Sequence, residues 1–244
     1  MVGDWKLNMM FLFIDSKTGL LPLAETSGGG LMGFLATGGY VMLLIVLSSM
    51  AVVATVVLAA LRLQKKRVVP DEVVARLQAV PEYAEKGDIR PLQQFLASHD
   101  SVLARVGVLA VSGNYSSREE CAQACATRAK EELHGLETGI PLLEMMVTVA
   151  PLLGLMGTTA ALVGMFSAFG GDAEAGPDTA AVAAEIGVAL RCTIAGLFVA
   201  VPSVMAHTYF IRRLDGYAVR MGSLLDQTIH DFFTHFEVRR SPEA

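Results

Sequence analysis

Charged side chains and cysteines are both scarce in this chain. Of its 244 residues, 18% are charged and 53% are hydrophobic, and the mean hydropathy is +0.49. This composition disfavours an ordinary soluble domain. The three cysteines, Cys121, Cys125 and Cys192, are too few and too unevenly placed for a disulfide framework, and none belongs to a CxxC pair of the kind that binds zinc. The basic residues form no stripe interleaved with aromatics, so nothing indicates a nucleic-acid groove.

Three long stretches contain no charged side chain at all: residues 26–61, 145–171 and 192–211. Each reaches the roughly 20 residues that a helix needs to cross about 30 Å of hydrocarbon, where only a helix satisfies its own backbone. The sequence therefore predicts an all-α integral membrane protein with three transmembrane helices. The predicted spans are residues 39–61, 142–169 and 186–210.

Lysine and arginine are distributed unevenly around these spans. Eleven of the nineteen lie between Arg62 and Lys130, five between Arg212 and Arg240, and none between residues 170 and 185. Loops rich in lysine and arginine stay in the cytoplasm, which predicts an outer N-terminus and an inner C-terminus. The predicted cytoplasmic segments are 62–141 and 211–244, and the predicted outer segments are 1–38 and 170–185. We expect segment 1–38 to include a short interfacial helix, and no cleaved signal peptide.

The basic segments have recurrent apolar positions that predict helices. Prolines interrupt residues 62–117, which favours several short helices. No helix breaker occurs from Arg118 to Pro141, so we expect a near-continuous helix running into the second span. An apolar stripe predicts that the third span also continues as a cytoplasmic helix, and that the two extensions form a helical bundle. The stripe consists of Leu214, Tyr217, Met221, Leu224, Leu225, Thr228 and Phe232.

Small residues recur along the second and third spans at spacings of four and three. Such stripes let helix backbones approach closely, which is how helices associate in lipid. Ordinary helix packing is therefore the favoured role of the glycines, and it does not exclude a pore-lining role. The predicted packing residues are Ala150, Gly154, Gly157, Ala161 and Gly164 in the second span and Gly196 and Ala200 in the third.

Two blocks carry a resemblance to a known family. The block V-A-P-L-L-G-L-M-G-T-T, residues 149–159, is followed by a short acidic loop and then by A-L-R-C-T-I-A-G-L-F-V-A-V-P-S-V, residues 189–204. In this order and at this separation they resemble the MotA/TolQ/ExbB proton-channel family. Three spans with one large segment between the first two resemble its TolQ/ExbB branch, since the MotA branch has four. Two positions depart from the family pattern, Val188, where a glutamate is frequent, and Arg191, where a small or apolar residue is usual.

The resemblance implies a role and partners. It implies that five copies of the chain form a homopentamer in the bacterial inner membrane. The outer segments would then lie in the periplasm. The ring would enclose a dimer of single-span ExbD/TolR-like partners whose aspartate carries protons. Proton flow would then energise an envelope process, with a TonB/TolA-like protein as a further partner. The matching residues are Pro151, Gly154, Gly157 and Thr158 in the second span and Thr193, Gly196 and Pro202 in the third.

The residues themselves favour a channel made of two kinds of subunit. A proton relay needs an ionisable group near the middle of the membrane, and the acids nearest the second and third spans, Glu144 and Glu185, lie at span edges. Thr158 and Thr193 lie at similar depth and are predicted to line the pore. The alternative is that each hydroxyl bonds a carbonyl of its own helix. Glu144 is either a cytoplasmic proton exit or a solvated helix flank.

Other features leave alternatives open. Pro151 and Pro202 are hinges or static kinks, because each removes a backbone hydrogen bond inside a span. Cys121 and Cys125 lie one turn apart, and core packing is favoured over a metal site with His134. No constellation suited to an enzyme or a cofactor occurs in the spans or in residues 62–140. The alternative function is a membrane scaffold or a conventional transporter subunit.

Overall fold

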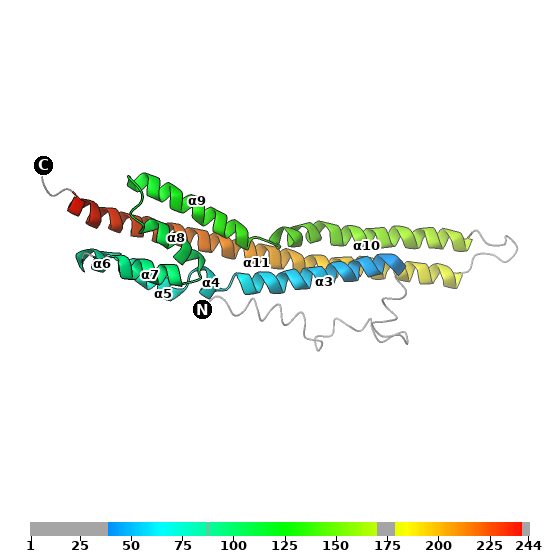
Figure 1. Ribbon diagram of the computed structural model, residues 1–244. Coiled ribbons are helices and arrows are strands. Elements are labelled where there is room, and N and C mark those ends of the chain that lie inside the picture. The colour runs from blue at the N-terminus through cyan, green and yellow to red at the C-terminus, as the bar shows by residue number, and fades with distance from the viewer. Residues whose placement is uncertain (1–38, 87, 170–178, 241–244) are drawn as a thin grey trace. The chain divides into compact units, whose positions relative to one another are not determined.

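The computed structural model describes residues 39–86, 88–169 and 179–240. The interfacial helix expected within segment 1–38 and most of the outer loop 170–185 lie outside the described residues. Within them, three helices are long and apolar enough to cross a membrane. These helices are α3 (Gly39–Arg62), α10 (Ile140–Phe169) and α11 (Thr179–Arg240) (Figure 1). The chain is therefore an all-α membrane protein, as its composition predicted.

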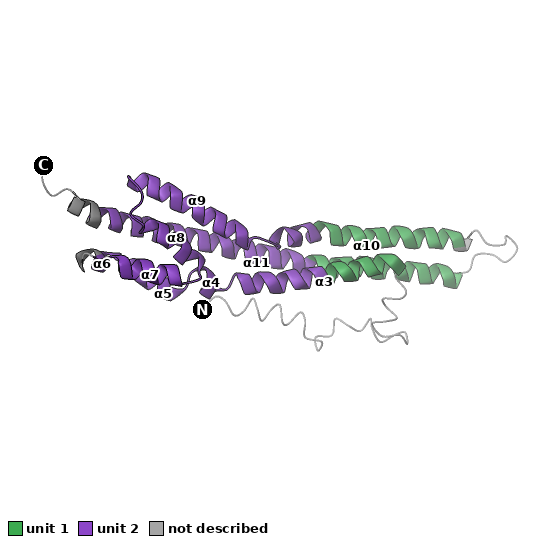
Figure 2. Cartoon of the chain, in the orientation of Figure 1, with its two compact units in different colours: residues 1–49, 148–200 green, residues 50–147, 201–244 purple. Residues whose placement is uncertain are grey.

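The chain divides into two compact units (Figure 2). Unit 1 takes residues up to Ser49 and residues Thr148–Ala200, so its described part consists of segments of α3, α10 and α11. Met42 and Ile45 of α3 and small residues such as Ala150 and Cys192 are buried inside it, and other large apolar side chains remain exposed on all three segments. In a membrane protein such side chains face lipid or neighbouring protein. The exposed set includes Leu43, Leu47, Leu155, Val163, Phe166, Ile194 and Phe198.

Unit 2 holds the remaining residues, Met50–Val147 and Val201–Ala244. Its core contains the largest fully buried side chains of the region, among them Leu77, Leu92, Leu103, Met221 and Ile229. The short helices are α4 (Lys65–Val68), α5 (Asp71–Gln78), α6 (Val80–Lys86), α7 (Arg90–Ser98) and α8 (Val102–Ala110), followed by the longer α9 (Arg118–Leu136).

Local sequence sets where these helices begin. The Ser101 hydroxyl accepts a hydrogen bond from the Ala104 amide at 3.2 Å, and Ser117 does the same for Glu120 at 3.1 Å. Each serine thereby satisfies a backbone donor that a helix start leaves unpaired. The apolar stripe predicted on α11 is buried at six of its seven positions, with Tyr217 half-buried. The prediction that this stripe faces a helical core is confirmed.

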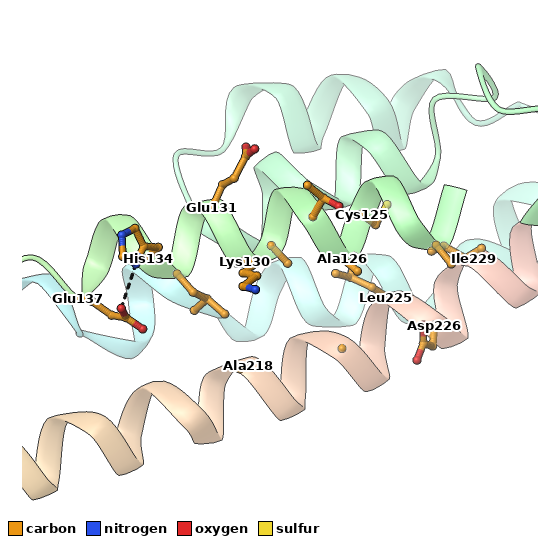
Figure 3. Close-up of a pocket in the computed structure, with 15 residues that line it drawn as sticks. Cys125, Ala126, Lys130, Glu131, His134, Glu137, Ala218, Leu225, Asp226 and Ile229 are labelled. Atoms are coloured by element: carbon orange, nitrogen blue, oxygen red, sulfur yellow. Dashed lines mark hydrogen bonds and ion pairs between the residues drawn. The ribbon is translucent and has the colours of Figure 1, made fainter. Parts of the chain in front are cut away.

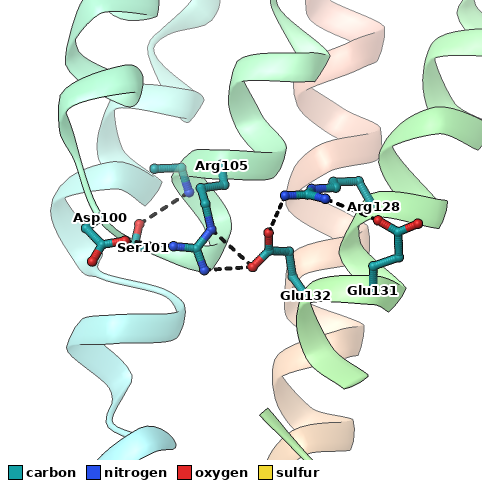
Figure 4. Close-up of polar contacts among 7 residues, drawn as sticks. Asp100, Ser101, Arg105, Arg128, Glu131 and Glu132 are labelled. Atoms are coloured by element: carbon teal, nitrogen blue, oxygen red, sulfur yellow. Dashed lines mark hydrogen bonds and ion pairs between the residues drawn. The ribbon is translucent and has the colours of Figure 1, made fainter. Parts of the chain in front are cut away.

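A bridge of charged side chains joins α8 to α9 (Figure 4). Arg105 on α8 donates to Glu132 Oε2 through Nη2 at 2.7 Å and to Asp100 Oδ1 at 2.7 Å. Arg128 on α9 contacts the other oxygen of Glu132 at 2.8 Å. Glu132 is only 13% exposed, and its carboxylate raises the pKa of the Arg105 guanidinium. The bridge therefore fixes how α9 packs on α8.

The prediction of a continuous helix from Arg118 into the second span is wrong. Helix α9 ends at Leu136 and α10 begins at Ile140. Gly139, just before α10, has φ +96°, a left-handed conformation that glycine adopts without strain and that no helix continues through. A Cβ atom at Gly139 would lie 3.3 Å from Cγ2 of Thr55 on α3, so the turn also approaches a neighbouring helix closely. Pro141 follows at the first turn of α10, where its missing N–H costs no helical bond.

Candidate functional site

The second and third spanning helices meet along a seam of small residues inside unit 1. A Cβ atom placed on Gly196 would lie 2.6 Å from the Ala150 carbonyl oxygen and 3.1 Å from the Gly154 Cα atom. A Cβ atom placed on Gly154 would lie 3.0 Å from the Cys192 carbonyl oxygen. The backbones of α10 and α11 are therefore in direct contact at these glycines. Any side chain larger than hydrogen would obstruct this contact. The contact lies within one chain.

The seam continues towards the acidic loop. A Cβ atom on Gly157 would collide with the Cys192 Cβ atom and would lie 3.4 Å from Cγ1 of Val41, which brings α3 against the same glycine. Further along α10, a Cβ atom on Gly164 would lie 3.0 Å from the carboxyl carbon of Glu185. As residue numbers rise on α10 they fall on α11, so the two helices are antiparallel along the seam.

This register fixes the relative depth of the two threonines. Thr158 is one residue beyond Gly157, and Thr193 is one residue beyond Cys192 in the opposite direction, so the two lie roughly 3 Å apart along the helix axes. Both side chains are half-buried. The Thr158 hydroxyl donates to the Leu155 carbonyl at 2.7 Å and the Thr193 hydroxyl to the Ala189 carbonyl at 3.4 Å. Each hydroxyl therefore bonds its own helix in this chain and keeps lone pairs for a further donor.

The two prolines lie in different units. Pro151 is half-buried within α10 in unit 1, and Pro202 is exposed within α11 in unit 2. Both helices continue through them, and each proline leaves one carbonyl without its usual helical donor. Their role as hinges stays a prediction.

Glu144 and His207 come together at the ends of the apolar runs, within unit 2. His207 Nε2 lies 4.0 Å from Glu144 Oε2, and their side chains are 26% and 72% exposed. This separation is longer than a hydrogen bond, and one water molecule or a small rotation would connect the imidazole with the carboxylate. The sequence places both residues at the inner ends of their spans, but it does not show that their side chains meet.

A groove of about 800 Å³ opens between α9 and α11 in unit 2 (Figure 3). It is lined by small residues such as Ala126, Ala218 and Gly222 and by charged residues such as Lys130, Glu131 and Asp226. Burial raises the pKa of the Cys125 thiol to about 12, so it stays protonated. Among the described residues, no group of three or more histidine, cysteine, aspartate or glutamate side chains is arranged to hold a metal ion.

A model of the MotA/TolQ/ExbB proton channel family matches residues 92–222, which is more than half of the chain. This chain belongs to the MotA/TolQ/ExbB proton channel family. The matched region begins in α7, contains all of α8, α9 and α10 and ends within α11. It therefore includes both threonines, both prolines and the small-residue seam. A comparison with curated proteins finds no match.

Proposed function

We propose that this family member is the proton-channel subunit of an inner-membrane motor of the TolQ/ExbB branch. The observation that carries the proposal is the seam between α10 and α11. Its register gives two threonines similar depth in spans that lack charge from Met145 to Gly171 and from Cys192 to Ile211. Three candidate spans among the described residues support the branch.

The assembly we propose is a ring, a pentamer of this chain, around a dimer of a single-span ExbD/TolR-like partner. The large apolar side chains left exposed on unit 1 support such an assembly, because ring neighbours, the partner and lipid would cover them. The partner supplies the aspartate that carries protons, since the second and third spans hold no carboxylate between their edge residues Glu144 and Glu185. A TonB/TolA-like protein receives the mechanical work, and no enzymatic step or cofactor is needed.

The ion path we propose runs from the periplasm to the cytoplasm. Thr158 and Thr193 form a polar belt whose hydroxyl oxygens accept a hydrogen bond from water or from the partner's protonated carboxyl group. When the carboxyl group loses its proton, each hydroxyl rotates away from its own helix carbonyl to donate to the carboxylate. Glu144 with His207 accepts the proton at the cytoplasmic end of α10. The uneven distribution of lysine and arginine supports this orientation.

The proposal is tested by proton flux into liposomes. We expect liposomes that hold this chain with its single-span partner to take up protons under an imposed potential. Liposomes that hold this chain alone, or the complex in which the partner's aspartate is replaced by asparagine, should take up few. Equal flux from this chain alone would indicate a conventional transporter and contradict the two-subunit channel. A stable chain that never binds a single-span protein would indicate a scaffold.

A further inference from the structure

Four basic side chains lie where α3 leaves its apolar run, and a fifth follows the end of the apolar run of α11. We call these residues the basic collar. All five are exposed, and four of them make no ion pair with any residue that the structure describes; the fifth, Lys65, contacts Asp71 at 2.6 Å. The collar consists of Arg62, Lys65, Lys66, Arg67 and Arg212.

Buried neighbours and hydrogen bonds hold the collar in one place. Leu63, Val68 and Val69 are fully buried on either side of its three consecutive bases, so the short helix α4 directs those bases outward. The Tyr217 hydroxyl donates to the Leu63 carbonyl at 3.1 Å, which ties α11 to the end of α3. Arg213 in turn donates to the Tyr217 hydroxyl at 3.1 Å. Arg212 is next to Arg213 on α11, one residue beyond the charge-free run that ends at Ile211.

Exposed apolar side chains adjoin the collar on the span side. On α3, Leu58 and Leu61 are 54% and 52% exposed, and on α11, Met205 and Tyr209 are 46% and 36% exposed. Tyr209 also accepts a hydrogen bond from Arg213 at 2.7 Å, a placement typical of an aromatic residue at the membrane–water interface. Bases directly beside an apolar surface match a ligand that has an anionic head and hydrocarbon tails.

We propose that the basic collar binds the headgroup of an anionic phospholipid, such as phosphatidylglycerol, whose acyl chains lie on Leu58 and Leu61. Four or more bases immediately beyond a membrane span attract anionic lipid, at roughly fivefold in affinity for each base. A free phosphate ion has no apolar part that could contact the apolar side chains beside the collar. The proposal requires the membrane location and not proton conduction, so the two are tested separately.

The test measures lipid binding by the detergent-solubilised full chain. Native mass spectrometry follows its titration with short-chain phosphatidylglycerol and, separately, phosphatidylcholine. We expect preference for phosphatidylglycerol, and about 25-fold weaker binding in Lys66→Gln/Arg67→Gln, since two charges are lost at roughly fivefold each. The matched control is Arg118→Gln/Lys130→Gln, which removes two exposed bases from α9 and should bind as the wild type does.

Two results would overturn the proposal. One is equal loss of binding in the collar variant and in the control variant, because net charge alone would then explain the attraction. The other is displacement of the lipid by inorganic phosphate at the same concentration, which would assign the collar to a free anion. Arg212→Gln is a second collar variant, and unchanged circular dichroism of both variants shows that folding is intact.

Discussion

Replacing Gly196 by alanine adds one methyl group at the tightest backbone contact of the seam. The new Cβ atom would lie 2.6 Å from the Ala150 carbonyl oxygen, whereas carbon and oxygen atoms in contact stay more than 3 Å apart. The obstacle is backbone, so it cannot rotate away, and the two helices must separate. Overpacking of this kind costs about 1–3 kcal/mol, which for a chain of this size lowers the melting temperature by about 2–12 °C.

The matched control is Gly222→Ala on the same helix, where nothing lies within 4 Å of the new Cβ atom. Alanine favours a helix over glycine by about 1 kcal/mol, so this variant should be as stable as the wild type or more stable. Thermal unfolding of the purified protein in detergent, followed by circular dichroism, compares the three proteins. If Gly196→Ala and Gly222→Ala have the same melting temperature, the helices are not in close contact at the seam and the register derived from it is wrong.

Three further outcomes are expected. Glu132→Gln, which weakens the bridge between α8 and α9, should lower the free energy of unfolding by about 1–2 kcal/mol in a denaturant titration, whereas Glu131→Gln, in an exposed pair, should change it by less than about 0.5 kcal/mol. Burial raises the pKa of Cys125 from 9.0 to about 12, so the folded state holds a proton that the unfolded state loses above pH 9. The free energy of unfolding should therefore fall between pH 9 and pH 11 more steeply in the wild type than in Cys125→Ala. Parallel slopes in the two proteins would refute the burial argument. A cysteine at Ala175 should react with an impermeant reagent in intact cells and one at Ala97 only after the inner membrane is breached; labelling of Ala97 in intact cells would reverse the orientation.

The spans and the buried face of α11 were predictable because their physical signals are local. Charge-free runs set the spans, and a stripe at helical spacing set the face of α11 that enters the core. The break between α9 and α10 also had a local signal, a glycine followed two residues later by proline at Gly139 and Pro141. Apolar positions recur across this break, which favours a near-continuous helix. Glycine in a left-handed conformation overrode that periodicity.

The contacts of the candidate site were less predictable, because they join residues distant in the sequence. Small-residue spacing marks a helix face for close packing, but it does not say which helix will pack there. The structure pairs Gly154 with Gly196 within one chain. It also brings His207 to Glu144, and the Glu185 carboxyl group to Gly164. None of these pairs has a signal in a single sequence, since each depends on the register of two antiparallel helices.

The most direct test of the proposed channel is the proton flux of Thr158→Val/Thr193→Val in complex with the single-span partner. Valine keeps the shape of threonine and removes only the hydroxyl. The matched control is Thr159→Val, because Thr159 adjoins Thr158 and also bonds its own helix, at 2.9 Å to the Met156 carbonyl. The account predicts that the double variant assembles normally but loses proton flux, while Thr159→Val conducts as the wild type does. Full flux through the double variant would contradict the polar belt as the proton path.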